Sequence, residues 1–161
     1  MPKVMMMCGK LCSGKSTHAE KLQKECRAVI LSIDEIMLAM FGHDAGEKHD
    51  DYVAKAKGYL YKKSLEIIES GTDVILDWGF WTKAERDYAR EFYGSRGIQN
   101  ELYYIDIDDR EWNRRIEKRN QNILAHKSSA YYVDEGLAAK FNAIFEKPDP
   151  SEIDHWVGRS V

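Results

Sequence analysis

The segment GKLCSGKST, from Gly9 to Thr17, restricts the fold of this chain more than any other part of its sequence. It matches the pattern GxxxxGK[ST] at every fixed position. An apolar run, Val4 to Cys8, precedes it, and Ser16 to Glu25 follows with the apolar periodicity of a helix. This order predicts a strand, a loop and a helix. A glycine turn with a chance lysine is the alternative, but it does not account for the flanking strand and helix.

Such a loop binds phosphate for three physical reasons. Glycines let the backbone wrap closely around phosphate oxygens, the first N–H groups of the next helix point at them, and Lys15 adds a mobile positive charge. The hydroxyl of Ser16 is placed to hold Mg²⁺. The sequence therefore predicts a site for nucleotide phosphates. Its residues are Gly9, Cys12, Ser13, Gly14, Lys15, Ser16 and Thr17.

The rest of the chain alternates short apolar runs with helical patterns. Further strands are predicted at Ala28 to Leu31, Val74 to Leu76, Leu102 to Ile107 and Ile153 to Val157. One helix is predicted to begin where Ser32, Asp34 and Glu35 follow the second strand. Further helices are predicted at Tyr52 to Ser70, Thr82 to Tyr93 with Thr82 as N-cap, Arg110 to Asn120, and Asp134 to Phe145. This alternation is typical of βαβ units, so we expect a mostly parallel sheet with helices on both faces.

Length and composition favour one globular domain spanning residues 1–161. Apolar residues make up 43% of the chain and charged residues 32%, which is ordinary globular composition. The net charge of −3 gives no overall positive field that would attract nucleic acid or anionic lipid. No apolar run is long enough to span a membrane, and we expect neither a membrane association nor a signal peptide.

The three cysteines and five histidines do not form a metal-binding pattern. Cys8, Cys12 and Cys26 are odd in number, which suits a reducing compartment better than a set of disulfides, so we expect a cytoplasmic protein. No second cysteine or histidine pair stands at the spacing of a zinc site. We interpret Cys8 and Cys12 as core and loop residues.

Two aspartates are predicted to lie at the carboxyl ends of strands beside the loop. Asp34 could orient a hydroxyl group for in-line attack and accept its proton, or it could only cap the helix that follows. Asp77 ends an apolar strand, where it could bind Mg²⁺ or hold Ser16, or serve only as a turn residue. Both alternatives remain open from the sequence.

The loop and four further segments together resemble one group of small P-loop kinases. The further segments are SIDEI at residues 32–36, DWGFWTKAER at 77–86, YIDIDDREWNRRIEKRN at 104–120 and FEKP at 145–148. This group includes AAA-like ATP-binding proteins, polynucleotide kinases, zeta toxins and chloramphenicol phosphotransferases. The resemblance implies a three-layer P-loop NTPase fold with five strands in the order 2-3-1-4-5, ATP as phosphoryl donor, and a basic lid around residues 110–132. It also implies that Asp34 accepts the proton of the acceptor hydroxyl.

The cations of the predicted lid have two interpretations. Arg110, Arg114, Arg115, Lys118 and Arg119 lie within ten residues, and Arg115 and Arg119 share one helical face. By resemblance to the lid helix, Arg115 and Arg119 would clamp phosphates. A solvated helix face, with Trp112 and Ile116 packing on the strand at Leu102, is the alternative.

Residues after Asp77 are weaker candidates for contacts with the acceptor. By resemblance Arg86 would face the acceptor, or it could pair with Glu85 or Glu91 on an exposed face. Among the aromatic residues that follow Asp77, we expect Trp78 and Phe80 in the core and Trp81 near the acceptor. The chain departs from polynucleotide kinases at Met37 and Ile123, where some of these carry arginines.

The sequence thus predicts a kinase that uses ATP and Mg²⁺ to phosphorylate a hydroxyl group of a small molecule or nucleotide. The catalytic residues would be Lys15, Asp34, Arg115 and Arg119, with Ser16 and Asp77 at the metal. The alternatives are a polynucleotide 5′-hydroxyl kinase, which the charge and Met37 disfavour, a zeta-toxin-like kinase of sugar nucleotides, and a regulatory module that binds nucleotide without catalysis. No protein partner is indicated by the sequence.

Overall fold

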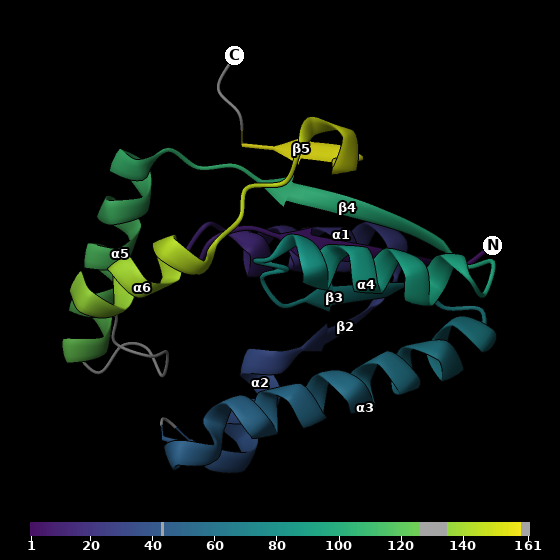
Figure 1. The fold of residues 1–161 in the computed structure, drawn as a ribbon, viewed down its shortest axis with the longest axis horizontal. Coiled ribbons are helices and arrows are strands. Elements are labelled where there is room, and N and C mark those ends of the chain that lie inside the picture. Colours follow the sequence, from purple (N-terminus) through teal and green to yellow (C-terminus); the bar gives the residue numbers. More distant parts are fainter. Residues whose placement is uncertain (43, 126–134, 159–161) are drawn as a thin grey trace.

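The computed structural model describes residues 1–42, 44–125 and 135–158, which form a sheet with helices on both faces (Figure 1). Its strands are β1 (Lys3–Cys8), β2 (Val29–Ser32), β3 (Val74–Asp77), β4 (Gln99–Ile105) and β5 (His155–Val157). The sheet has the order β2-β3-β1-β4-β5, and each pair of neighbours is parallel. This confirms the predicted fold class and strand order.

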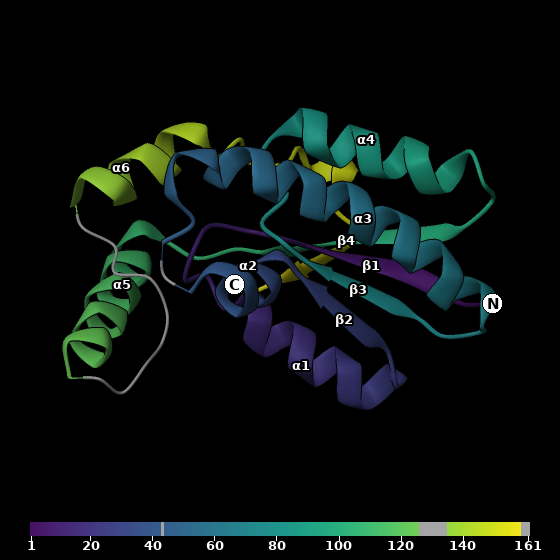
Figure 2. The same ribbon diagram turned by 90° about the horizontal axis from the view of Figure 1, so that it is seen from below.

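The central strand β1 divides the core into two faces. Val4, Met6 and Cys8 belong to one cluster of buried side chains, whereas Met5 and Met7 belong to another. This alternation follows from the strand period of two, and because both faces are covered the run is apolar throughout. Helix α1 (Lys15–Cys26) covers one face, and α3 (His49–Glu69) and α4 (Lys83–Gly94) cover the other (Figure 2).

The register of the strands brings three chain segments to one edge of the sheet. Ser32 at the end of β2 pairs with Asp77 at the end of β3, and Met6 of β1 pairs with Leu76 of β3. The parallel direction then places everything that follows these strands at the same edge. The phosphate-loop segment after Cys8 lies there.

Local capping signals determine where two of the helices begin. Helix α2 (Ile33–Phe41) is capped by Ser32, whose Oγ accepts from the Glu35 backbone N–H at 3.2 Å. The alternative in which Asp34 is the cap is therefore wrong, because Asp34 already lies in the first turn. At α4 the predicted cap is confirmed, and Thr82 and Glu85 form a reciprocal capping box.

Most boundaries lie close to the predicted ones, but β4 differs. It was expected at Leu102 to Ile107 and is observed at Gln99–Ile105. Its polar start is held by backbone pairing with β1 and by an ion pair of 3.0 Å between Lys3 and Glu101. Ile107 has left the sheet and packs beside helix α5 (Asp109–Leu124).

The C-terminal part contains α6 (Glu135–Ile144) and a short 3₁₀ turn, Pro150–Glu152; another such turn, Gly46–Lys48, precedes α3. The predicted lid, residues 110–132, corresponds to α5 up to residue 125, and its remainder lies outside the described residues, as does Asp134. Among the helices that the structure describes, none is both long and apolar enough to cross a membrane.

Candidate active site

The loop between β1 and α1 requires glycine at two positions. A Cβ at Gly9 would lie 2.7 Å from Ser13 Oγ and 3.0 Å from the Ile105 carbonyl oxygen. Gly14, the N-cap of α1, has a φ of 101°, which an L side chain rarely adopts. A Cβ at Gly14 would also lie 3.0 Å from Nη1 of Arg115. Glycine is therefore needed at both positions, because a side chain would collide with neighbouring groups of the protein and, at Gly14, strain the backbone.

Inside the loop, the polar groups turn toward one another. The Lys15 ammonium donates to the Lys10 carbonyl at 2.7 Å, and the Ser13 N–H donates to the same oxygen at 3.1 Å. Burial lowers the pKa of Lys15, and the nearby carboxylates of Asp77 and Asp34 act in the opposite direction. Ser13 Oγ is buried and has no hydrogen-bond partner within the described residues. Such an arrangement supplies donors for an anion.

The two aspartates lie at or just after strand ends at the carboxyl edge of the sheet, and the charges of both act against the burial that lowers the pKa of Lys15. Asp77 Oδ2 accepts a hydrogen bond of 2.8 Å from Ser16 Oγ, which ties the end of β3 to the first turn of α1. Burial raises the pKa of Asp77, although Ser16 and Lys15 partly offset this. Asp34 is exposed in the first turn of α2, two residues after β2 ends. The structure thus brings Asp34, Asp77, Lys15 and Ser16 together.

Helix α5 lies against the loop, and three of its side chains donate hydrogen bonds to it. Arg115 Nη1 donates to the Ser13 carbonyl at 2.7 Å, Arg119 Nη1 lies 3.1 Å from Cys12 Sγ, and Trp112 Nε1 donates to the Leu11 carbonyl at 2.6 Å. Arg119 Nε is buried without a hydrogen-bond partner in the described part of the chain. The two arginines placed at the phosphates by the family resemblance are therefore the two that reach the loop.

The other lid residues are placed differently. Arg110, Arg114 and Lys118 are exposed, and Arg114 pairs with Glu111 at 2.7 Å. Trp112 and Ile116 are buried, but they pack against Leu11, Cys12, Ile107, Leu137 and Ala138. The expected packing of these two residues on the strand at Leu102 is wrong, because α5 leaves the sheet and rests on the loop and on α6.

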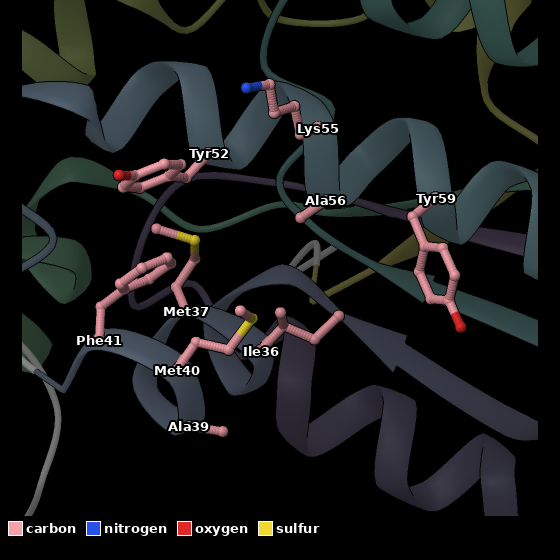
Figure 3. A pocket seen from close by; sticks show the side chains of 9 residues that line it. All are labelled: Ile36, Met37, Ala39, Met40, Phe41, Tyr52, Lys55, Ala56 and Tyr59. Atoms are coloured by element: carbon pink, nitrogen blue, oxygen red, sulfur yellow. The ribbon is translucent and has the colours of Figure 1, made fainter.

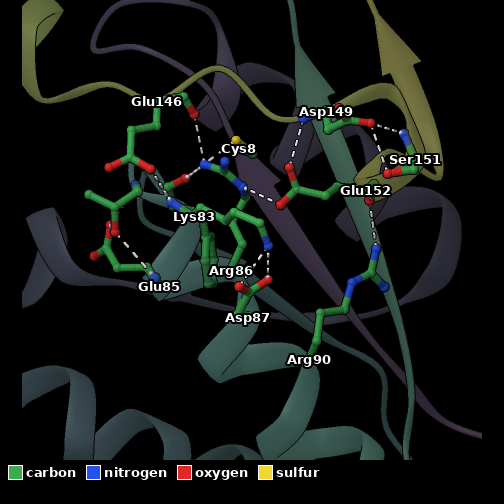
Figure 4. Close-up of polar contacts among 12 residues, drawn as sticks. Cys8, Lys83, Glu85, Arg86, Asp87, Arg90, Glu146, Asp149, Ser151 and Glu152 are labelled. Atoms are coloured by element: carbon green, nitrogen blue, oxygen red, sulfur yellow. Dashed lines mark hydrogen bonds and ion pairs between the residues drawn. The ribbon is translucent and has the colours of Figure 1, made fainter.

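Arg86 does not point toward the predicted acceptor. It is 2% exposed on α4 and donates to Glu152 at 3.0 Å and to the carbonyls of Phe80 and Glu146 at 2.9 Å (Figure 4). This placement differs from both expectations for Arg86, which were a contact with the acceptor and pairing with Glu85 or Glu91 on an exposed face. One of its partners, Glu146, belongs to the FEKP segment at residues 145–148, which carries part of the family resemblance.

Of the aromatic residues after β3, Trp78 and Phe80 lie in the core as expected, and Trp81 lies nearer the loop. Trp78 and Phe80 are 7% and 1% exposed, and their rings stack with centroids 5.4 Å apart. Trp81 is half-buried, its Nε1 donates to the Gly9 carbonyl at 3.1 Å, and its ring meets Phe141 edge to face. Trp81 therefore lies beside the loop.

The cysteines are free thiols, and Cys8 is buried. Burial raises the pKa of Cys8 to about 12, so the thiol stays protonated at neutral pH. In the described ranges, no group of three or more His, Cys, Asp or Glu side chains is arranged to hold a metal ion. Cys8 lies in the core, and Cys12 lies in the loop between β1 and α1.

A separate cavity of about 600 Å³ lies between α2 and α3 (Figure 3). Its lining is mainly apolar and consists of Ile36, Met37, Ala39, Met40, Phe41, Tyr52, Lys55, Ala56 and Tyr59. Phe41 and Tyr52 stack at one end with ring centroids 4.6 Å apart. Asp34 and the loop residues do not belong to this lining, so the cavity is distinct from the phosphate loop.

The parallel sheet of this order and its glycine loop define the chain as a P-loop NTPase-type protein. Residues 4–148 match the model of an AAA domain family, and the chain belongs to that family. This match confirms the resemblance inferred from the motifs. Among curated proteins, no sequence matches the chain.

Several solved structures share the fold. The APS kinase CysC of Mycobacterium tuberculosis, in complex with AMPPNP and APS, is 18% identical with a TM-score of 0.69, over 99% of this chain and 90% of that one. Kti12 of Chaetomium thermophilum, in complex with ADP-AlF3, is 15% identical with a TM-score of 0.68, over 96% and 87%. A chain of the Pnkp1/Rnl/Hen1 RNA repair complex is 19% identical with a TM-score of 0.70, over 89% of this chain but 43% of that one. At these identities the likeness establishes the fold.

Proposed function

We propose that this protein is an ATP-dependent kinase that transfers the γ-phosphoryl group to a hydroxyl group of a small molecule or nucleotide. One observation carries the proposal: two carboxylates at one edge of the sheet both act electrostatically on the loop lysine, and Asp77, but not Asp34, is hydrogen-bonded to Ser16. Phosphoryl transfer needs both a site for the phosphates and a separate group that orients the attacking hydroxyl. Asp34, exposed and close to Lys15, has the position for that second task.

The loop and α5 would bind the phosphates of ATP. The Lys15 ammonium would exchange its bond to the Lys10 carbonyl for phosphate oxygens, and the N–H groups at the start of α1 would donate to them. Arg115 and Arg119 would add charge-assisted hydrogen bonds from the opposite side. Their contacts with the Ser13 carbonyl and with Cys12 Sγ support this role.

The residues at the loop fit a magnesium ion. Ser16 Oγ and Asp77 Oδ2 are hard oxygen ligands 2.8 Å apart, and Mg²⁺ in such sites takes few protein ligands because nucleotide phosphates and water complete its shell. When bound, the ion would neutralise charge on the β- and γ-phosphates. Asp77 would hold Ser16 and the metal.

Asp34 would act on the acceptor. Its carboxylate would accept the proton of the hydroxyl group as the hydroxyl oxygen attacks the γ-phosphorus and the bond to the ADP oxygen breaks. Lys15, Arg115 and Arg119 would stabilise the negative charge on the transferring group.

Two observations favour a compact acceptor over a polynucleotide. The net charge is −3, so the chain has no overall positive field of the kind that favours binding to several nucleic-acid phosphates. Met37 is 2% exposed, so a buried apolar side chain stands at the position where some polynucleotide kinases carry arginine. We also place the protein in the cytoplasm, since its three thiols are unpaired.

The test is ATP consumption, with product detection, against nucleosides, sugars, sugar nucleotides, aminoglycosides, chloramphenicol-type alcohols and 5′-hydroxyl oligonucleotides. We expect one class of small hydroxyl compound to be phosphorylated. Preferred phosphorylation of oligonucleotide ends would replace this proposal with a polynucleotide kinase. Nucleotide binding without transfer to any acceptor would favour a regulatory module.

A further inference from the structure

We propose that Arg86 is a positioning residue that determines the geometry of the phosphate loop through the connection between β3 and α4, residues 78–82. The inference rests on the proposed nucleotide site but adds a residue that does not touch the nucleotide. It starts from the burial of Arg86. A guanidinium group that is almost fully buried is costly unless its donors are satisfied. Here Nε and Nη1 bond to Glu152, Phe80 and Glu146 (Figure 4).

The connection that Arg86 holds has an unfavourable backbone conformation. Phe80 has a φ of 46°, in the left-handed region that is unfavourable for a residue with a Cβ. Such a conformation persists where neighbouring groups hold it. The Phe80 carbonyl accepts from Arg86 Nη1 and from Cys8 Sγ, and the Phe80 ring is buried against Trp78. Arg86 is thus one of the groups that keep this turn in place.

The same connection holds both backbone polar groups of the first loop residue. The Gly9 N–H donates to the Gly79 carbonyl at 3.1 Å, and the Gly9 carbonyl accepts from Trp81 Nε1 at 3.1 Å. Phe80 lies between these two residues in the chain. A shift of the Phe80 carbonyl therefore moves the groups that orient Gly9 on either side of it.

The C-terminal segment supports the connection from outside. The Glu146 N–H donates to the Trp81 carbonyl at 2.7 Å, and Glu146 Oε2 accepts from the Lys83 N–H at 3.0 Å. Arg86 bonds to the Glu146 carbonyl and to Glu152 on the same segment. A continuous set of contacts thus runs from residues 146–152 through Arg86 and the connection to Gly9.

The helix offers a matched control. Arg90, one turn further along α4, also binds this C-terminal segment, through the Glu152 carbonyl at 2.8 Å and Asp154 at 2.7 Å. Its other contact is with Asn100 on β4. Substitution of Arg90 should therefore weaken the C-terminal segment without acting directly on Phe80.

The experiment measures AMPPNP affinity by calorimetry, below the melting temperatures of the variants, for R86K, W81F, their combination and R90K. The readout needs no acceptor. Trp81→Phe removes the donor to Gly9 and keeps a smaller aromatic ring, and Arg86→Lys keeps the charge but cannot make the same three bonds. Each single change should weaken binding by about three- to tenfold, the size of one or two lost hydrogen bonds. The double variant should lose little more affinity than either single variant, because both changes act through one set of contacts.

The control R90K should have a lower melting temperature than the wild type but the same affinity for AMPPNP.

The proposal is overturned if folded R86K binds AMPPNP like the wild type, or if the two losses multiply in the double variant. If R86K does not fold, Glu152→Gln takes its place, since Glu152 holds the guanidinium from the other side. If the wild type does not bind AMPPNP, the proposed kinase function fails. The positioning role is then judged by amide hydrogen exchange in residues 9–14, which should be faster in R86K than in R90K; equal rates would refute it.

Discussion

At the scale of single residues, Lys15 and Asp34 carry opposite parts of the proposed reaction. Lys15 is half-buried in the loop and bonds to the Lys10 carbonyl, where its charge faces the position proposed for the phosphates. Asp34 is exposed on the neighbouring helix, so it can meet an acceptor that arrives from solvent. The two residues therefore make separable predictions.

Lys15→Ala should leave the protein folded and lower phosphoryl transfer by about 10² or more, because a donor that stabilises transition-state charge is lost. The measurements are turnover with the acceptor found in the panel and the circular dichroism of the variant. Turnover within about threefold of the wild type would show that the loop is not the donor site.

Asp34→Asn should lower kcat by roughly 10² to 10⁴ while ATP affinity stays unchanged, since the amide keeps the size but cannot take a proton. Ser32 is the cap of α2, so no large loss of stability is expected. Calorimetric ATP affinity measured beside turnover provides the check. Weakened ATP binding with a proportionate loss of turnover would move Asp34 to the metal site, and Asp77 would become the first choice for the catalytic carboxylate.

At the scale of elements, α5 is the part of the fold that joins the lid to the loop. Its buried face, Trp112 and Ile116, packs on Leu11 and Cys12, and this packing turns Arg115 and Arg119 toward the loop. Arg114, on another face of the same helix, pairs with Glu111. The helix thus contains both a candidate phosphate ligand and a comparable cation that points elsewhere.

Arg119→Met should lower kcat by about 10² or more, because it removes a charged donor proposed to act on the transferring phosphoryl group. Arg114→Met, a control with the same change of charge on the same helix, should change kcat by less than about twofold, since exposed i,i+3 pairs contribute little. Steady-state kinetics of both variants test this. Equal losses would mean that the net charge of α5, and not the position of Arg119, affects the rate.

At the scale of the whole molecule, ion pairs hold the C-terminal segment to the rest of the fold. Burial, the largest single influence, would raise the pKa of Glu152, but the hydrogen bonds from Arg86 and from the Asp149 N–H outweigh it and hold the pKa below its usual value. The pKa of Asp154 is lowered in the same way by the Leu102 N–H and Arg90. Glu152 thus joins the 3₁₀ turn to α4, and Asp154 joins the start of β5 to α4 and β4.

These shifts make the folded state sensitive to acid. A carboxyl whose pKa is lower in the folded than in the unfolded state binds fewer protons when folded. Its contribution to stability is therefore complete above the unfolded value of about 4.5 and is lost as pH falls through the folded value. Glu152→Gln should reduce stability at neutral pH and flatten the fall below about pH 4.5.

Urea unfolding between about pH 7 and about pH 3 measures this effect as the free energy of unfolding. Glu117→Gln, on an exposed part of α5, is the control and should leave the slope as in the wild type. An unchanged slope in Glu152→Gln would show that Glu152 does not contribute to the acid sensitivity.

Much of the fold and the centre of the site could be predicted because their signals are local. The loop residues are consecutive, so glycines, lysine and serine at fixed spacing specify a phosphate-binding turn without reference to the rest of the chain. The capping box at Thr82 and Glu85 is equally local, and the alternation of apolar runs with helical patterns predicted the parallel sheet.

Packing across the chain settled the rest. Whether Arg86 points to solvent or to the interior depends on Glu146 and Glu152, 60 and 66 residues away, and a helical pattern does not contain that information. Arg119 reaches Cys12 across 107 residues because Trp112 and Ile116 seat α5 on the loop. Local geometry is encoded by neighbours in sequence. The direction of a long charged side chain is decided by which distant groups can satisfy it once the core has formed.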